Sequence, residues 1–505
     1  MKNRKLSYRF AVIVLVLIFL GLSFIYMFWG RIFLDAGFYL NAAMRVSKGD
    51  IPYRDFFFVQ GPVYPYTYAL WFLIFEPGVG SGRIFSILLS LASLFFAYHL
   101  AKLWSNRNGA FWCLLALCSS PLHAYYFSSI KLYALAGLLL TASAFFLFGK
   151  FHPLLRYSLG GILSVMAAAT RLTLLPGTLI FILYIVIDGW HVDRKAMVWS
   201  IIFSLSAGLL LFAPFILLDF NALFYNLFAI HVSADTGPYR FGLMNKVRVL
   251  VKLSAAYPLI VIGLTALAVL FLIPAFRPRI RFAHLAVFLA VLSITLAHVS
   301  ANWFSAGYQS VLMPLTAALT AGIIFSNQQS IVMKKWFRIA LGTVVAIGSL
   351  VTYKEPLWPG GTTILGYLKE TGKTLSEITP PDRSIAGCNA VYAISAKRPI
   401  AEPFGGAPFT FTPKWDNDTC RRFGGINVPM LVTMLHDQIP YTLVLENDSF
   451  AVGFPGFFEV PENQQAMIFA TIQRSYDHIN TLSNIGSAEQ KLLVFIPHEH
   501  NLVTR

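Results

Sequence analysis

Apolar runs separated by short basic gaps make up most of the first 350 residues. A helix that crosses the hydrocarbon core of a bilayer needs about 20 predominantly apolar residues, and the first such run extends from Phe10 to Trp29. By the same rule we expect further spans at roughly 83–101, 109–126, 131–149, 157–170, 171–187, 196–218, 254–274, 282–299, 306–325 and 337–353. The pattern therefore predicts a polytopic α-helical membrane protein with about 11 transmembrane helices.

The first run follows a basic N-terminal stretch, which is also how a secretory signal peptide begins. It is too long for the apolar region of a signal peptide and no small-x-small cleavage site follows it, so we interpret it as an uncleaved first helix. With the N-terminus in the cytoplasm, every gap that falls on the inner side is basic, as the positive-inside rule requires. The basic residues of these gaps are Lys102 and Arg107, Lys150 and Arg156, Arg194 and Lys195, Arg277, Arg279 and Arg281, and Lys334, Lys335 and Arg338.

The composition changes near residue 354, after which no spanning run remains. Polar residues, proline and glycine become more frequent, and Tyr441–Leu445 and Leu492–Ile496 are typical of buried strands. We expect a transmembrane domain over 1–353, with a first outer loop at 30–82, followed by a soluble α/β domain over 354–505. An odd number of spans places this second domain outside the cytoplasm, in an N-in/C-out topology.

Four cysteines bear on this assignment. Cys388 and Cys420 both lie in the predicted outer domain, where they either form a disulfide or remain two free thiols. Cys113 and Cys118 lie in a predicted span and read as packing residues.

The composition agrees with a membrane protein. Hydrophobic residues make up 57% of the 505 residues and charged residues 12%, whereas soluble domains have about 25% charged residues. The net charge of +16 is carried largely by the gaps between spans, which indicates topology signals and contacts with anionic headgroups. We see no nucleic-acid-binding module and expect no nucleic-acid partner.

The first outer loop concentrates candidate chemistry. Asp35 follows the first span closely, and carboxylates at a membrane face often mark function; the alternative is that Asp35 caps a helix starting at Ala36. Asp55 is a second carboxylate of the loop, which either orients a substrate or binds a divalent cation, or is a solvated neighbour of Arg54. An aromatic cluster begins just before Asp55 and continues after it. It either forms re-entrant or interfacial helices that bind a lipid tail or a sugar, or is only an aromatic belt at the membrane interface. Its members are Tyr53, Phe56, Phe57, Phe58, Tyr64, Tyr66, Tyr68, Trp71 and Phe72.

The order of these residues resembles a known family. An acid just after the first span, Tyr39 four positions on, a G-x-x-x-Y-x-D segment from Gly49 to Asp55, and a Gly-Pro at 61–62 are similar to the first loop of the C superfamily of glycosyltransferases. The similarity is to the bacterial branch with protein O-mannosyltransferases, lipid A aminoarabinose transferases and lipopolysaccharide-core galacturonic acid transferases. It extends over about the first 350 residues through Arg83 and the segment from Gly160-Gly161 to Thr173, and into the tail at Ser384–Tyr392 and Arg398-Pro399.

The resemblance implies an enzyme that transfers a sugar from a polyprenyl-phosphate donor to a lipid, glycan or protein acceptor outside the cytoplasm. It places Asp35 as the catalytic base or acceptor-orienting acid, with Asp55 in support and Tyr39, Tyr53, Gln60 and His231 lining the substrate site. A carboxylate can accept the proton of an attacking hydroxyl. A bacterial inner membrane, with the active site on the periplasmic side, is the implied location.

The leaving lipid phosphate needs cationic partners. The candidates are Arg83, Arg171 and Arg240, followed by Lys246 and Arg248. Arg171 interrupts an apolar stretch near a predicted outer face, which is a mark of function unless the side chain only reaches for headgroups. His231 and Asp235 belong to the same outer loop as Arg240 and either line the site or are structural.

One departure from the family stands out. The aminoarabinose transferases carry Glu-Lys-Pro in the second element of the first loop, where this chain has Gln60-Gly61-Pro62. An acid and a phosphate-binding lysine are therefore missing at that place, so Asp55 and another cation would have to substitute. The resemblance leaves the use of a metal open, and His498 with His500 near the C-terminus reads as a frayed tail rather than a metal pair.

Other functions remain as alternatives at the level of the sequence. No Walker A loop, dinucleotide fingerprint, HExxH or GxSxG motif occurs in a persuasive context, so a cytoplasmic nucleotide-sugar mechanism has no support. A transporter or flippase of lipid-linked sugars is the main alternative, although we find no inverted repeat. A polymerase or ligase of surface polysaccharide and a non-catalytic scaffold are further alternatives.

Overall fold

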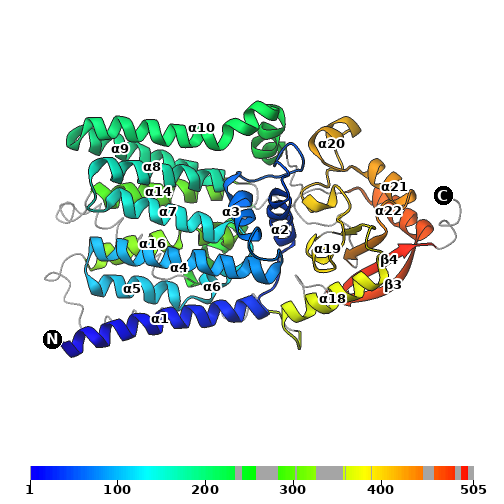
Figure 1. Cartoon of the computed structure of the whole chain (residues 1–505), viewed down its shortest axis with the longest axis horizontal. Coiled ribbons are helices and arrows are strands. Elements are labelled where there is room, and N and C mark those ends of the chain that lie inside the picture. The colour runs from blue at the N-terminus through cyan, green and yellow to red at the C-terminus, as the bar shows by residue number, and fades with distance from the viewer. Residues whose placement is uncertain are drawn as a thin grey trace. The chain divides into compact units, whose positions relative to one another are not determined.

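The computed structural model describes residues 2–233, 242–256, 282–301, 304–325, 348, 357–358, 360–387, 389–446, 460–483 and 491–498. These residues are mostly helical and fall into two compact units (Figure 1). The first unit comprises 1–27, 84–212 and 241–356, and the second comprises 28–83, 213–240 and 357–505.

The first unit is a bundle of apolar helices. Its helices α7, α8, α9 and α14 pack one against the next, and α16 packs against α5 and α7 (Figure 1). The elements are α1 (Lys2–Trp29), α4 (Val79–Trp104), α5 (Arg107–Cys118), α6 (Pro121–Ser128), α7 (Tyr133–Phe148), α8 (Pro153–Thr170), η1 (Leu172–Leu174), α9 (Leu175–Val192), α10 (Arg194–Phe224), α12 (Leu243–Ala256), α14 (Phe282–Ser300), α15 (Ala306–Ser310) and α16 (Met313–Ile324), of which α1, α4 and α10 continue into the second unit.

Several of these helices are long and apolar enough to cross a membrane. In the part of the chain that the structure describes, five qualify: Tyr8–Trp29, Val79–Trp104, Leu172–Val192, Arg194–Ala229 and Phe282–Ser300. A sixth is added if α6 and α7, which are bent by 105° at their break, count as one span. The expectation of an integral membrane protein with several apolar helices is thus confirmed. The predicted spans 254–274 and 337–353 lie outside the described residues, except for 254–256 and 348.

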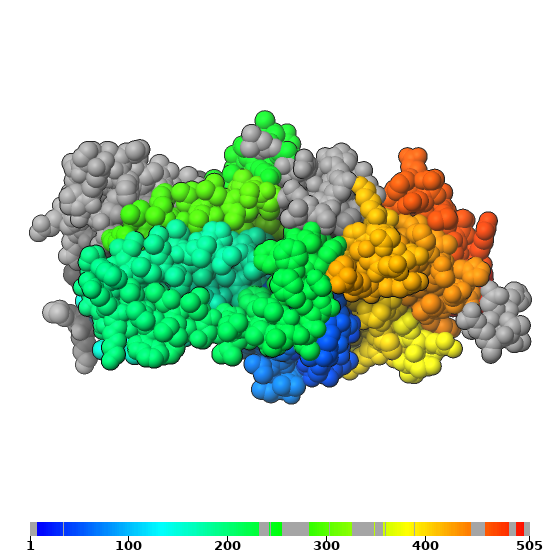
Figure 2. All heavy atoms as spheres, turned by 90° about the horizontal axis from the view of Figure 1, so that it is seen from above, coloured from blue at the N-terminus to red at the C-terminus, as the bar shows by residue number. Residues whose placement is uncertain are grey.

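Helix α10 shows how the lipid-facing surface is built. Along its length, large apolar side chains such as Leu205, Leu210 and Leu217 are exposed, and the part in the first unit forms an outer face of the bundle (Figure 2). Exposed apolar side chains at this density suit contact with lipid rather than with water. The helix breaks at Asp219, which has non-helical φ and ψ and whose carboxylate accepts the N–H of Ala222, so the predicted span 196–218 ends where expected.

Two predicted spans, 109–126 and 306–325, are interrupted in the structure. The span at 306–325 is divided between α15, which ends at Ser310, and α16, which begins at Met313. The continuous helix expected over 109–126 is wrong, because α5 ends at Cys118 and α6 begins at Pro121. Ser120 caps the new helix by accepting the N–H of His123, and proline is favoured in the first turn. The expected pair of helices meeting at Arg171 is present: α8 ends at Thr170 and α9 begins at Leu175. At the other ends of these two helices, Arg156 and Tyr157 both contact the carboxylate of Asp188.

Helices α7 and α8 approach closely at the Gly160-Gly161 pair. A Cβ added at Gly160 would lie 2.9 Å from Cβ of Leu147, so only glycine allows this approach. Small residues at helix contacts are typical of membrane proteins.

The second unit combines the first outer loop with the C-terminal residues. Its elements are α2 (Leu34–Ser47), α3 (Val63–Phe72), η2 (Tyr225–Ala229), α11 (Ile230–Ser233), α18 (Ile364–Ile378), β1 (Ile385–Gly387), α19 (Val391–Ser395), η5 (Phe404–Gly406), α20 (Asn417–Phe423), α21 (Val428–His436), β2 (Thr442–Glu446), α22 (Glu462–Ser475), β3 (Tyr476–Ser483) and β4 (Lys491–Pro497). The expected strands near 441–445 and 492–496 are present as β2 and β4.

The sheet has the order β1-β2-β4-β3. Strand β1 is parallel to β2, with Ile385 opposite Thr442, and the remaining pairs are antiparallel. Its core packs against α21 and α22, and includes Leu431, Leu443 and Ile472. This α/β arrangement provides the rigid body on which the first outer loop is mounted.

Candidate active site

Asp35 lies in the first turn of α2, directly after the loop leaves α1. The helix begins at Leu34, and its N-cap residue Phe33 makes no side-chain capping bond. Asp35 is therefore not the cap of a helix that starts at Ala36, so that alternative is wrong. A carboxylate in the first turn interacts favourably with the helix dipole, and its backbone position is fixed by the helix.

Tyrosine side chains of α2 and α3 form a cluster that begins about one helical turn after Asp35. Asp35 and Tyr39 are four positions apart and so lie on the same face of α2. The ring of Tyr39 meets that of Tyr64 of α3 edge to face at 5.1 Å, and Tyr64 stacks on Tyr68 at 4.4 Å.

Tyr64 is the most unusual member of this group. It is fully buried, and its hydroxyl has no hydrogen-bond partner among the residues that the structure describes. Burial raises the pKa of Tyr64 well above its usual value, and the neighbouring Tyr68, Tyr39 and Asp35 add to the increase. The phenol therefore stays protonated, and its O–H donor lies within electrostatic range of the Asp35 carboxylate. Leaving such a donor unpaired costs about 1–3 kcal/mol.

Asp55 is engaged in local contacts. Arg54 donates two hydrogen bonds of 2.7 Å to its two carboxylate oxygens, and the N–H of Ile51 donates a third. These bonds from Arg54 hold the pKa of the Asp55 carboxyl below its usual range. The geometry agrees with the loop-residue alternative and gives Asp55 a role in closing the turn from Ile51 to Asp55.

Tyr53 and Gln60 are joined by a hydrogen bond within the first outer loop. Tyr53 is buried and adopts a φ of 71°, in the left-handed region that side chains other than glycine rarely occupy. Its hydroxyl donates to the carbonyl oxygen of Gln60 over 2.6 Å, and its ring packs edge to face on Phe215. Backbone strain of this kind often accompanies functional sites.

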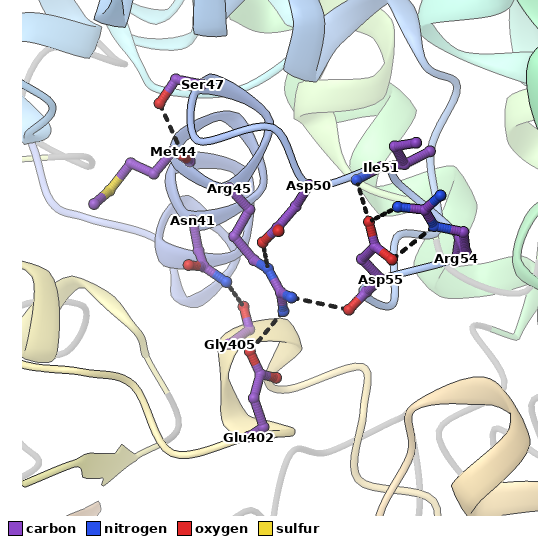
Figure 3. Close-up of polar contacts among 10 residues, drawn as sticks. All are labelled: Asn41, Met44, Arg45, Ser47, Asp50, Ile51, Arg54, Asp55, Glu402 and Gly405. Carbon is purple, nitrogen blue, oxygen red and sulfur yellow. Dashed lines mark hydrogen bonds and ion pairs between the residues drawn. The ribbon is translucent and has the colours of Figure 1, made fainter.

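The most extensive polar network of the loop centres on Arg45, at the end of α2 (Figure 3). Its guanidinium donates to the carboxylates of Asp50 and Glu402 at 2.7 and 2.6 Å and to the carbonyl oxygen of Asp55 at 2.9 Å. The guanidinium also lies over the ring of Phe56, 4.8 Å from its centroid. One cation thus joins the loop to itself and to the C-terminal residues of the same unit.

The same face of α2 makes two more contacts with C-terminal residues. Asn41 donates to the carbonyl oxygen of Gly405 at 3.0 Å. A Cβ added at Gly37 would lie 2.3 Å from the side-chain oxygen of Asn389 and 2.7 Å from the backbone nitrogen of Ala390. Gly37, Asn41 and Arg45 are spaced by four residues, so they form one stripe along the helix. This stripe fixes the orientation of the helix that carries Asp35.

The remaining candidates of the second unit make backbone contacts. Nη2 of Arg83, which is 3% exposed, donates to the carbonyl oxygens of Gly30 and Arg31 at 2.9 and 3.2 Å. The ring Nε2 of His231 lies 3.2 Å from the carbonyl oxygen of Val59. Arg83 and His231 therefore hold the start and the middle of the first loop, while Arg240 and Asp235 lie outside the described residues.

Arg171 belongs to the first unit and lies where α8 gives way to α9. It is 6% exposed, its guanidinium lies 3.8 Å from the ring centroid of Tyr308, and its Nε donates to the hydroxyl of Thr173 at 3.0 Å. The other two candidate cations of this unit make ordinary contacts: Lys246 donates to the carbonyl oxygen of Val299 at 2.6 Å, and Arg248 is exposed.

The cysteines and the C-terminal histidine have structural contacts. Cys420 is a free, buried thiol 3.4 Å from the hydroxyl of Thr412, so it is not in a disulfide; Cys388 lies outside the described residues. Cys113 and Cys118 are buried free thiols, as expected of packing residues. His498 pairs with Asp477 at 2.9 Å, so it is not part of a frayed tail, whereas His500 is outside the described residues. Within the described ranges, no three His, Cys, Asp or Glu side chains form a group that could hold a metal ion.

Several important residues were missed by the sequence interpretation. Arg45 and Glu402 carry no local signal of their partnership, because 357 positions separate them. Lys131, a buried cation described below, was visible as a charge at the edge of a predicted span. Tyr64 was only one of many aromatic residues in its segment.

Comparison with known proteins establishes the fold. Neither a protein-family model nor a curated protein sequence matches the chain. Among solved structures, ArnT from Cupriavidus metallidurans in the apo state has a TM-score of 0.61 and 13% identity, covering 96% of this chain and 97% of that one. The same protein bound to undecaprenyl phosphate gives a TM-score of 0.59 at 12% identity, with the same coverage.

A second similar structure comes from an archaeon. The oligosaccharyltransferase AglB from Archaeoglobus fulgidus, solved with an inhibitory peptide and a dolichol-phosphate, has a TM-score of 0.52 and 11% identity, covering 99% of this chain and 75% of that one. Both ArnT, a lipid A aminoarabinose transferase, and AglB are members of the C superfamily of glycosyltransferases. This chain therefore has a fold similar to that of these two proteins, as the resemblance of its first loop led us to expect.

Proposed function

We propose that this chain is a membrane glycosyltransferase that moves a sugar from a polyprenyl-phosphate donor to an extracytoplasmic acceptor. The observation that carries the proposal is the placement of Asp35 on a helix that is held by three contacts with C-terminal residues and whose Tyr39 packs on the buried Tyr64, in a chain with this fold. The similar structures were solved with undecaprenyl phosphate or dolichol-phosphate bound, which supports a lipid-phosphate donor. The acceptor is a lipid, glycan or protein.

The reaction assigns each group a task. The acceptor hydroxyl attacks the anomeric carbon, a C–O bond forms, and the bond between that carbon and the phosphate oxygen breaks. The electron pair leaves with polyprenyl phosphate, and the proton of the hydroxyl passes to the Asp35 carboxylate. Buried cations stabilise the charge on the leaving phosphate. Arg171 is a buried candidate whose Nε donates to the hydroxyl of Thr173 rather than to a backbone carbonyl.

The other site residues support this reaction. We propose that Asp55 orders the loop through Arg54 and Ile51, and that Arg83 and His231 hold the same loop by their backbone contacts. Tyr39 lines the sugar site together with Tyr64. Tyr53 and Gln60 line the same site and stabilise the conformation of the loop through their hydrogen bond. Arg240 remains a candidate partner of the donor phosphate on the basis of its place in the sequence.

The membrane arrangement is part of the proposal. We place the chain in a bacterial inner membrane with about 11 spans by the hydropathy rule, the N-terminus inside and the active site facing the periplasm. The transmembrane catalytic domain comprises 1–353, and the extracytoplasmic domain comprises 354–505.

The test is sugar transfer by the purified protein. A panel of radiolabelled polyprenyl-phosphate sugars is incubated with the protein in liposomes and a membrane extract as acceptor. We expect transfer by the wild type and a fall of about 10²-fold or more for Asp35→Asn, the scale of a lost general base. Asp418→Asn is the matched control, because that side chain is 95% exposed. Equal transfer by the wild type and Asp35→Asn would contradict the assignment of Asp35. Absence of transfer with every donor, by a folded protein that binds polyprenyl phosphate, would favour a flippase instead.

A further inference from the structure

The first unit holds a second buried cation, Lys131, which shares an aromatic neighbour with Arg171. Lys131 lies in the break between α6 and α7 and is 5% exposed, which is close to the exposure of Arg171. Both cations lie near the ring of Tyr133. The distance from its centroid is 5.6 Å for Nζ of Lys131 and 5.8 Å for Cζ of Arg171. Two separate helix breaks therefore bring two positive charges to the same aromatic side chain.

The partners of Arg171 do not neutralise its charge. They are the ring of Tyr308, the ring of Tyr133 and the hydroxyl of Thr173, and in the part of the chain that the structure describes no carboxylate pairs with it. A buried cation without a counter-ion is costly, because its lost hydration is not repaid. The arrangement is expected of a site that receives its negative charge from a ligand.

A polar group beside the cations is also available to a ligand. The hydroxyl of Thr173 lies between Arg171 and His298, and its Oγ1 is 2.9 Å from Nε2 of His298. His298 is fully buried, and its other ring nitrogen, Nδ1, has no hydrogen-bond partner within the described ranges. An unpaired buried nitrogen at a cationic cluster can bind a ligand oxygen at little further cost.

The cluster belongs to the outer end of the bundle by the positive-inside rule. Helix α8 begins beside the basic gap at Lys150 and Arg156, and Arg171 follows its other end. Helix α14 follows the basic gap at 277–281 and carries His298 near its last residue, Ser300. Basic gaps mark the cytoplasmic side, so both helices present the cluster at the face where the phosphates of the outer leaflet lie.

We infer that Lys131 and Arg171 form one anion site that binds the phosphate of a polyprenyl lipid. The inference rests on the proposed function and names the part of the chain that holds the donor phosphate. The ammonium of lysine provides a compact charge and the guanidinium of arginine a planar fork, and both are suited to phosphate oxygens.

The experiment measures binding rather than activity. Radiolabelled undecaprenyl phosphate is titrated into full-length protein in detergent, for the wild type, Lys131→Met and Arg171→Met. Loss of one charged contact weakens binding by roughly tenfold to hundredfold, so we expect that loss in both variants. Lys150→Met is the matched control, because Lys150 is exposed, and it should bind as the wild type does.

Two further arms identify the ligand chemistry. The uncharged polyprenol should bind weakly and equally to all variants, and inorganic phosphate at millimolar concentration should compete if the headgroup alone is recognised. Lack of competition, with charge-dependent binding retained, would assign the site to the lipid-borne phosphate. Lys131→Arg keeps the charge and should bind close to the wild type, so an equal loss in Lys131→Arg and Lys131→Met would show that the residue is structural and would overturn the inference.

The outcomes separate this inference from the proposed function. Sugar transfer that depends on Asp35, together with unchanged lipid binding in Lys131→Met and Arg171→Met, would overturn the anion site and leave the glycosyltransferase in place. Charge-dependent binding by a protein that transfers no sugar would confirm the anion site and contradict the enzyme.

Discussion

Arg45 donates a hydrogen bond from Nη1 to Oε1 of Glu402 over 2.6 Å, although 357 positions separate the two residues. The bond joins the end of the helix that carries Asp35 to the C-terminal part of the same compact unit. Because Arg45 also holds Asp50 and the carbonyl oxygen of Asp55, one side chain fixes the helix, the turn after it and the C-terminal contact together (Figure 3). The position of the proposed base therefore depends on residues far from it in the sequence.

Replacing Arg45 with methionine should loosen this arrangement. The variant loses three charged contacts, but since Arg45 is 20% and Glu402 59% exposed, we expect a cost of only about 1–2 kcal/mol together with a large fall in transfer. The measurement is the thermal midpoint of the purified protein beside its transfer rate. Arg54→Met is the control for stability, because its pair with Asp55 is local and exposed, and it should lower the thermal midpoint less than Arg45→Met does. Equal stability losses for the two variants would contradict a special role for Arg45.

Gly37 should not tolerate alanine. The added methyl group would meet Asn389 and the backbone of Ala390 at 2.3–2.7 Å, and overpacking of this kind costs typically about 1–3 kcal/mol. We expect a lower thermal midpoint and a reduced transfer rate for Gly37→Ala. Gly80→Ala is the matched control, because its methyl group would meet Cδ1 of Leu365 at an ordinary 3.6 Å, and it should be neutral. A wild-type midpoint for Gly37→Ala would show that α2 is not held at this contact.

Replacing Tyr64 with phenylalanine should separate stability from catalysis. The change removes a buried hydroxyl that has no partner in the described structure, so the protein should be as stable as the wild type, or more stable by about 1 kcal/mol. If that hydroxyl helps to position the acceptor or Asp35, kcat should fall while KM for the lipid donor changes little. The two quantities are measured by thermal unfolding and by initial rates across donor concentration. A purely structural Tyr64 would leave kcat unaltered.

The pair of His498 and Asp477 should make the last strand depend on pH. The hydrogen bond that the His498 ring donates to the Asp477 carboxylate raises the pKa of His498 above its usual value. A raised pKa in the folded state means that the pair stabilises the protein below the unfolded pKa of about 6.5 and that this contribution is lost as the pH rises through the raised value. Hydrogen exchange of the amides at 491–498, compared between the wild type and His498→Asn, should differ near pH 6 and converge near pH 9. A difference that is the same at both pH values would show that the imidazole does not titrate with the fold.

The sequence predicted the apolar helices well, because the requirement for about 20 apolar residues is a strong local signal. The division of two spans at Arg171 was predicted from that single charged residue, and hydropathy alone predicted that another span ends at 218, next to the helix break at Asp219. The break at Ser120-Pro121 was missed, because hydropathy averages over a window and the short cap-and-proline signal is diluted in it. Strands β2 and β4 were predicted as apolar runs, whereas β3 was missed, because it lies at the sheet edge and is mostly exposed.

The site was only partly predictable for a different reason. Asp35 is detectable because an acid beside a span is rare and its cost is local. The contacts of Gly37, Asn41 and Arg45 depend on partners at 389–405 that no local pattern connects to them. Lys131 was read as the edge of a helix that the structure begins only at Tyr133. Long-range pairing, rather than residue chemistry, limited the interpretation.

The topology itself can be tested with two cysteine substitutions in a chain whose native cysteines are replaced by alanine. Lys150 lies in a predicted inner gap and is exposed, and Asp382 lies in the predicted outer domain and is 80% exposed. A membrane-impermeant maleimide added to spheroplasts should label Asp382→Cys at once and Lys150→Cys only after lysis. The positive-inside rule gives the reason, since the gap around Lys150 also carries Arg156. The predicted topology has an odd number of spans between residues 150 and 382. Labelling of both positions from the same side would mean that this number is even, and it would move either the C-terminal domain or the proposed active site to the cytoplasm. In that case a donor facing the cytoplasm would have to replace the periplasmic one.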